Sequence, residues 1–143
     1  MATPRFAHLG LAVADLAAAR ADLERALGVT FEPTEHVASQ AVDVAFCDAA
    51  GLELVAATSD RNPAIPMLPH PIASHLAKHG PGPHHVAYAV ADLDAAIAEA
   101  RARGVRTLTP EPQVGAGGHR VVFLHPADCH DLLVELCEDP DVR

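Results

Sequence analysis

The chain of 143 residues contains no tryptophan, and aromatic residues make up only 3% of it. Half of its residues are hydrophobic, and because so few of these are aromatic, its core must be built mainly from small aliphatic side chains. No stretch reaches the roughly 18 uncharged apolar residues that a membrane helix needs, and Asp15 interrupts the N-terminal apolar stretch before a signal peptide is complete. The sequence therefore predicts a soluble cytoplasmic protein without a membrane partner, of a length that suits one domain.

Lysine is nearly absent as well. One lysine and nine arginines are scattered singly along a chain of net charge −9, so no basic stripe exists and we expect no nucleic-acid partner. The three cysteines, Cys47, Cys129 and Cys137, are an odd number without a CxxC pair. This pattern fits a reducing compartment better than a framework of disulfides.

What the chain does contain is an internal repeat. The segment that begins at His8, HLGLAVADLAAARADLERALGV, matches the segment that begins at His85, HVAYAVADLDAAIAEARARGV. The spacing is 77 residues until a single-residue gap near the end of the match. The same spacing relates VAF at 44–46 to VVF at 121–123. The second copy then carries about five extra residues, within HPADCHD, before LVEL answers GLELV. Glu53 and Glu135 therefore occupy equivalent positions.

Each copy has the pattern of one structural unit. The apolar runs at 6–13 and 84–90 alternate as strands do. Asp15 and Asp92 are suited to cap the helices that follow, which the helical spacing of apolar residues predicts and which Gly28 and Gly104 end. Further strand-like runs follow at 29–34, 41–48 and 51–58 in the first copy and at 105–110, 120–126 and 131–138 in the second.

These elements predict an α+β fold of one domain made of two βαβββ modules. The first module spans about 5–58 and the second about 84–138. Between them, residues 59–83 are rich in proline and glycine and contain a short predicted helix at 71–80. We expect the duplicated modules to form a cleft-shaped, partly open mixed sheet around a metal site.

The metal site follows from the polar residues that the repeat places inside apolar strands. These are a histidine in the first strand of each copy and a glutamate in the last: His8, His85, Glu53 and Glu135. A carboxylate inside such a strand is costly to bury unless it is paired or bound to a metal. Two imidazoles and two carboxylates suit a divalent ion, Zn²⁺, Ni²⁺, Co²⁺ or Mn²⁺, that polarises a carbonyl and stabilises an enolate.

At these residues the sequence resembles the vicinal oxygen chelate superfamily, and within it the methylmalonyl-CoA epimerases. The resemblance runs through HLGLAVADL, HPIASHLAKHGPGPHHVAYAV and GGHRVVFLHP followed by LVELCE. It implies paired βαβββ modules around one metal, with His8, Glu53, His85 and Glu135 as ligands. It also implies an isomerase that removes a proton next to a carbonyl of an acyl-CoA or another carbonyl acid, with Glu135 as catalytic base, and a homodimer.

Two positions depart from the epimerase pattern. Ser39 stands where those enzymes typically carry a glutamate, and epimerisation needs proton transfer on both faces of the carbon. The loop at 127–131 contains Asp128 and Asp131, which would repel a phosphate or a carboxylate if they faced the cleft; the alternative is a solvated hairpin loop.

Other functions stay open. A glyoxalase I-type lyase acting on a thiol hemithioacetal uses the same four ligand types, and a drug- or metabolite-binding member of the superfamily would need no metal. An extradiol dioxygenase fits less well, because it uses two histidines and one carboxylate on iron and Glu53 would crowd its open face.

Outside these four residues, His75 and His79 are four residues apart on the predicted linker helix, a spacing that can bind metal, but no third ligand is evident. We expect His84 to point to the other strand face from His85 and to be packed.

Overall fold

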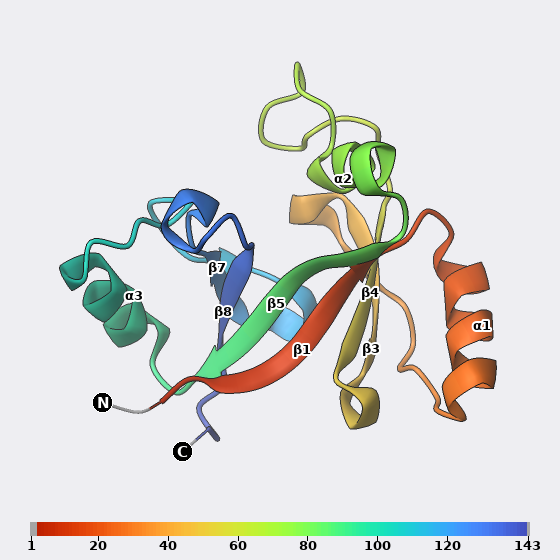
Figure 1. Ribbon diagram of the computed structural model, residues 1–143, viewed down its shortest axis with the longest axis horizontal. Helices are drawn as coiled ribbons and strands as arrows, with labels where there is room; N and C mark the ends of the chain where they lie inside the picture. Colours follow the sequence, from red (N-terminus) through yellow and green to blue (C-terminus); the bar gives the residue numbers. More distant parts are fainter. Residues whose placement is uncertain (1–2, 143) are drawn as a thin grey trace. The chain divides into compact units, whose positions relative to one another are not determined.

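The computed structural model describes residues 3–142, which contain three α-helices and eight strands (Figure 1). The helices are α1 (Leu16–Leu27), α2 (Pro71–His79) and α3 (Leu93–Ala102). The strands are β1 (Arg5–Ala12), β2 (Glu35–Val37), β3 (Val42–Cys47), β4 (Leu52–Ala57), β5 (Gly82–Val90), β6 (Gln113–Val114), β7 (Arg120–Phe123) and β8 (Val134–Glu138). The order βαβββ therefore occurs twice, and the predicted α+β fold with a mixed sheet is confirmed.

The described chain forms two compact units. One holds residues 9–84, and the other joins residues 3–8 to residues 85–142. Strand β1 contributes to both, because its first residues group with the elements of the second repeat. The module boundaries that the repeat predicts stay a prediction, since the repeat describes sequence and the units describe packing.

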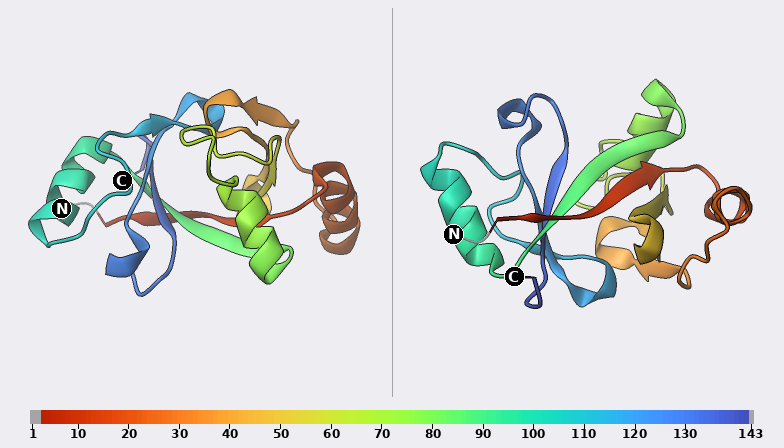
Figure 2. Two further views of the ribbon diagram at one scale, coloured as in Figure 1. Left: turned by 90° about the horizontal axis from the view of Figure 1, so that it is seen from above. Right: turned by 60° about the horizontal axis from the view of Figure 1, so that its bottom comes forward.

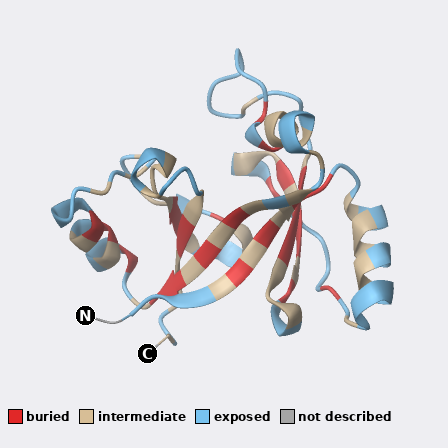
Figure 3. Ribbon diagram, in the orientation of Figure 1, coloured by how far each residue is buried: buried red, intermediate tan, exposed pale blue. Residues whose placement is uncertain are grey.

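The two units have matching strand pairings. In the first, β4 is parallel to the end of β1 and antiparallel to β3, which is antiparallel to β2. In the second, β8 is parallel to β5 and antiparallel to β7, which is antiparallel to β6. Along β1 and β5, buried and more exposed residues alternate, as the sequence pattern predicts (Figure 3).

The helices begin and end where their caps predict. The Asp15 and Asp92 carboxylates each accept a hydrogen bond from a backbone N–H three residues on, at 3.0 Å. Gly28 ends α1 with φ of +67°, a left-handed conformation that favours glycine. Helix α1 packs on β3 and β4, and α3 packs on β8 (Figures 1 and 2).

Two predicted strands are wrong. Residues 29–34 and 105–110 are not strands, and the short strands lie later, at β2 and β6. The first run makes one backbone bond to β3, from Glu32 to Phe46. The second makes two, from Leu108 to Phe123 and from His125 to Arg106, which form only an isolated bridge at the end of β7. Proline at 33 and 110 lacks the N–H that a longer ladder would use.

Among the described residues, no helix is both long and apolar enough to cross a bilayer.

Candidate metal centre

Three of the four predicted ligands come together in one unit, from three strands. His8 lies on β1, His85 on β5 and Glu135 on β8, with relative exposures of 9%, 6% and 8%. Alternation along β5 and β8 places His85 and Glu135 on the sheet face opposite α3, because Val90 and Leu136 pack in the core beneath that helix. The strand pattern thus turns three polar side chains to one face.

The three side chains are close enough to share an ion. One potential ligand atom from each lies within 4.8 Å of the others, and no other group of three or more such residues in the range 3–142 meets that criterion. His8 Nε2 is 3.9 Å from Glu135 Oε1, and the two imidazole centroids are 5.6 Å apart with their planes at 84°. Two imidazoles and a carboxylate at this spacing fit a divalent metal with remaining coordination positions for water or substrate.

Two apolar residues flank Glu135 in the sheet. Glu135 is paired in register with Ala87 on β5 and with Phe123 on β7, and the Phe123 ring meets the His85 ring edge to face at 5.6 Å. A buried carboxylate in such surroundings is costly without a compensating positive charge. A bound divalent ion would favour the ionised carboxylate, and the spacing of the three side chains makes the cluster a candidate metal centre.

Glu53, the fourth predicted ligand, lies on β4 in the other unit and is 7% exposed. Its register partners are Gly10 and Phe46. They correspond to the Ala87 and Phe123 partners of Glu135, so the two glutamates occupy equivalent positions in their sheets. The equivalence that the sequence repeat predicts is confirmed, while the ligand role of Glu53 stays a prediction.

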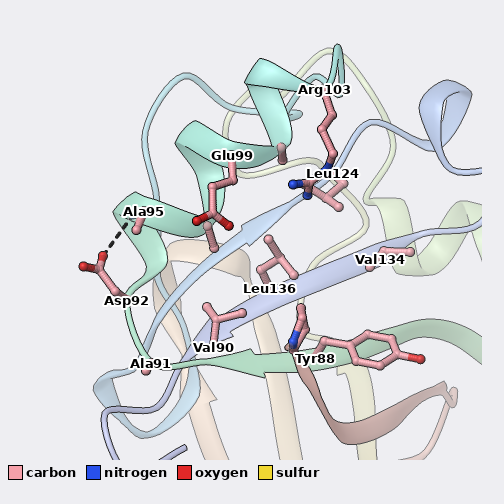
Figure 4. Close-up of a pocket in the computed structure, with 13 residues that line it drawn as sticks. Tyr88, Val90, Ala91, Asp92, Ala95, Glu99, Arg103, Leu124, Val134 and Leu136 are labelled. Carbon is pink, nitrogen blue, oxygen red and sulfur yellow. Dashed lines mark hydrogen bonds between the residues drawn. The ribbon is translucent and has the colours of Figure 1, made fainter. Parts of the chain in front are cut away.

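The pocket in Figure 4 lies on the other face of the second unit. It has a volume of about 500 Å³ and lies between α3 and the outer face of β5 and β8, where Tyr88, Val90, Val134 and Leu136 line it. Along β5, Tyr88 and Val90 alternate with His85. This pocket is therefore separate from the candidate metal centre.

The structure also places the two positions that depart from the epimerase pattern. Ser39 is exposed in a 3₁₀ turn, Ala38–Gln40. Asp128 accepts three hydrogen bonds from Arg106, two from its side chain and one from its backbone N–H, at 2.9 to 3.1 Å. This guanidinium holds the pKa of Asp128 down at about 2.

The negative charge of Asp128 is thus neutralised by Arg106, which lies outside this loop. Asp131 is exposed and follows His130, and both have left-handed backbone, with φ of +62° and +57°. The sequence pattern missed the partner of Asp128 because Arg106 lies 22 residues earlier. The loop is a hairpin connection between β7 and β8 and is held by an ion pair. This agrees with the solvated hairpin loop, one of the two alternatives that the sequence leaves open.

Comparison with known proteins agrees with this geometry. Residues 7–123 match the family model of the Glyoxalase/Bleomycin resistance protein/Dioxygenase superfamily. The chain belongs to this superfamily. Among its relatives there, the Ethylmalonyl-CoA/methylmalonyl-CoA epimerase of Cereibacter sphaeroides is 35% identical over 92% of this chain and 96% of that protein. The mitochondrial methylmalonyl-CoA epimerase of Bos taurus is 33% identical over 92% of this chain and 73% of that protein.

A solved superfamily structure shares the fold. The Streptomyces coelicolor methylmalonyl-CoA epimerase, as a variant in complex with 2-nitronate-propionyl-CoA, superposes with a TM-score of 0.82 at 35% identity. The match covers 97% of this chain and 96% of that one. The resemblance on which the sequence analysis relied is confirmed over nearly the whole chain.

Proposed function

We propose that the chain is a metal-dependent epimerase that acts on methylmalonyl-CoA or a closely related acyl-CoA with an acidic carbon between two carbonyl groups. The observation that carries this proposal is the buried group of His8, His85 and Glu135 on one sheet face. Its chemistry agrees with the activity that the names of the relatives give to them. The neutralised charge of Asp128 also removes one objection to a substrate that carries phosphates.

In this proposal the imidazoles of His8 and His85 and the carboxylate of Glu135 hold the ion, with Glu53 as the fourth ligand. A divalent ion here, Zn²⁺, Co²⁺, Ni²⁺ or Mn²⁺, would supply positive charge next to a carbonyl oxygen that becomes negative when the neighbouring C–H bond breaks. Glu135 is also the proposed catalytic base. Its carboxylate takes the proton from the carbon, and its burial between Ala87 and Phe123 in the sheet limits the access of water to it.

Proton exchange with inversion is the test that addresses the epimerase reaction itself. One stereoisomer of methylmalonyl-CoA is incubated with metal-loaded protein in D₂O, and deuterium at the α-carbon and the appearance of the other stereoisomer are both followed. We expect both. Exchange without inversion would mean that protons are transferred on a single face of the α-carbon. This outcome is the main challenge to the proposal, because the exposed Ser39 stands where the epimerases typically carry a glutamate. Absence of exchange would contradict the enolate chemistry as well.

Two measurements separate this proposal from the other members of the superfamily. Methylglyoxal with a thiol serves as the counter-substrate, and we expect no turnover if the chain is an epimerase and not a lyase. Metal analysis of the purified protein distinguishes both enzymes from a binding protein that needs no ion. We expect about one divalent ion per chain to be lost when His85 is replaced by alanine, because His85 is buried and donates one of two imidazoles.

A further inference from the structure

Three histidines outside the candidate metal centre lie together in the first unit. His75 and His79 are one turn apart on α2, with ring centroids 4.9 Å from each other. His84, near the start of β5, meets the His75 ring edge to face at 5.0 Å. The sequence spacing shows the pair on the helix, but only the structure shows the third histidine beside it.

The backbone between α2 and β5 produces this arrangement. Gly80 ends the helix with its N–H donated to the Leu76 carbonyl and a φ of +70°, and Gly82 has a φ of +152°. Both are left-handed conformations that favour glycine. Pro81 and Pro83 alternate with these glycines and restrict the connection further. The short, stiff turn brings His84 back beside His75 on the helix.

The spacing of the rings suits a shared ion. Two imidazoles bound to one tetrahedral ion, with metal–nitrogen bonds of about 2.0–2.1 Å, have ring centroids about 5 Å apart. The His75–His79 and His75–His84 separations, 4.9 and 5.0 Å, have this value. As placed, the three histidines do not have one potential ligand atom each within 4.8 Å of the others, so one side chain must move to complete the site. His79 is exposed and can change rotamer on a nanosecond timescale, whereas His75 and His84 are half-buried.

We propose that His75, His79 and His84 form a second metal site. Its three imidazoles favour ions that prefer this ligand, and Zn²⁺ is the ion that we expect to bind there. Two histidines four residues apart on a helix, with a third ligand from elsewhere, make a common zinc site, and the fourth position is open to water. Because successive residues of a strand point to opposite faces, His84 and His85 serve different ions. The site clamps the end of α2 to the first residues of β5.

Zinc stoichiometry tests the site through a difference between variants. Wild-type protein and His79→Ala are stripped of metal, saturated with Zn²⁺, freed of excess and analysed for zinc per chain. We expect His79→Ala to bind about one ion fewer than wild type. The difference does not depend on whether the His8, His85 and Glu135 group binds zinc. An exposed histidine elsewhere is the control, and His119→Ala should bind as many ions as wild type.

A third variant and a second readout make the result decisive. His84→Ala should lose the same ion, whereas an unchanged zinc content in His84→Ala would reduce the site to the helix pair and overturn the three-histidine assignment. Saturating Zn²⁺ should raise the melting temperature of wild type more than that of His79→Ala, since an ion that binds only the folded chain stabilises it. Equal stoichiometry in wild type and His79→Ala would overturn the proposal.

Discussion

Helices α1 and α3 occupy equivalent positions in the two repeats, yet they contribute differently to their cores. Helix α3 buries Leu93, Ile97 and Ala100, whereas α1 buries none of its residues. At the position of Ile97, α1 has Arg20, which donates hydrogen bonds to the Phe31 carbonyl and to the Thr34 hydroxyl.

In the first repeat, the apolar volume that α1 does not supply comes from the segment that follows this helix. Phe31 is 4% exposed and packs in the core of that unit, and the corresponding residue of the second repeat is Thr107. The same strand pairings are thus supported by different core residues. A duplicated fold preserves backbone hydrogen bonding and strand register, while the packing on each sheet can change as long as the volume is filled.

The largest difference that we expect between the repeats is chemical. Glu135→Gln should lower the rate of α-proton exchange by about 10² to 10⁴-fold, because an amide cannot act as a base. Glu53→Gln, at the equivalent register position, should lower metal affinity but keep exchange once the protein is saturated with metal. Exchange rates and metal content are measured for both variants. Equal losses of exchange in metal-saturated protein would show that the two carboxylates share one role.

The second-largest difference should come from shortening a core leucine in each helix. Leu93→Ala should destabilise the protein by about 2–5 kcal/mol, because Leu93 is fully buried and leaves a cavity. Leu16→Ala, the equivalent change in α1, should cost about 1 kcal/mol, since that side chain is only half-buried. Urea denaturation measures both free energies of unfolding. Similar values would contradict the comparison of the two helices.

Helix capping should show a smaller difference. Asp15→Ala removes the acceptor for the Ala18 N–H and should cost about 1 kcal/mol. Asp92→Ala removes the acceptor for the Ala95 N–H, but Glu138 also accepts from the Leu93 N–H and keeps a negative charge at this helix end. Its cost should be about 0.5 kcal/mol. Thermal unfolding compares the two, and an equal loss would show that Glu138 does not compensate.

The smallest effect concerns the extra residues of the second repeat. Because Arg106 lowers the folded-state pKa of Asp128 to about 2, the stability from this ion pair is present above the unfolded pKa, about 4, and is lost as the pH falls toward 2. Asp128→Asn should therefore show a shallower decline of unfolding free energy between about pH 4 and pH 2 than wild type. Parallel curves would exclude this contribution.

Much of the fold could be predicted because its signals are local. The N-caps, the glycine that ends α1, the linker helix and the alternation of β1 and β5 depend on neighbouring residues, and the structure contains all of them. The strand predictions failed at 29–34 and 105–110. There an apolar run carries no information about whether a partner strand runs alongside for long enough to form a ladder, and the structure has one bond at the first run and an isolated bridge at the second.

By itself, the sequence determined the duplication, and through it the equivalence of Glu53 with Glu135 and the choice of His8, His85 and Glu135 as candidate ligands. The tertiary structure decided what meets across long separations in the chain. It paired Arg106 with Asp128, placed His84 beside His75, and filled the two cores with Phe31 in one unit and with residues of α3 in the other. Such contacts depend on how turns and sheets bring distant segments together, and spacing along the chain does not encode that geometry.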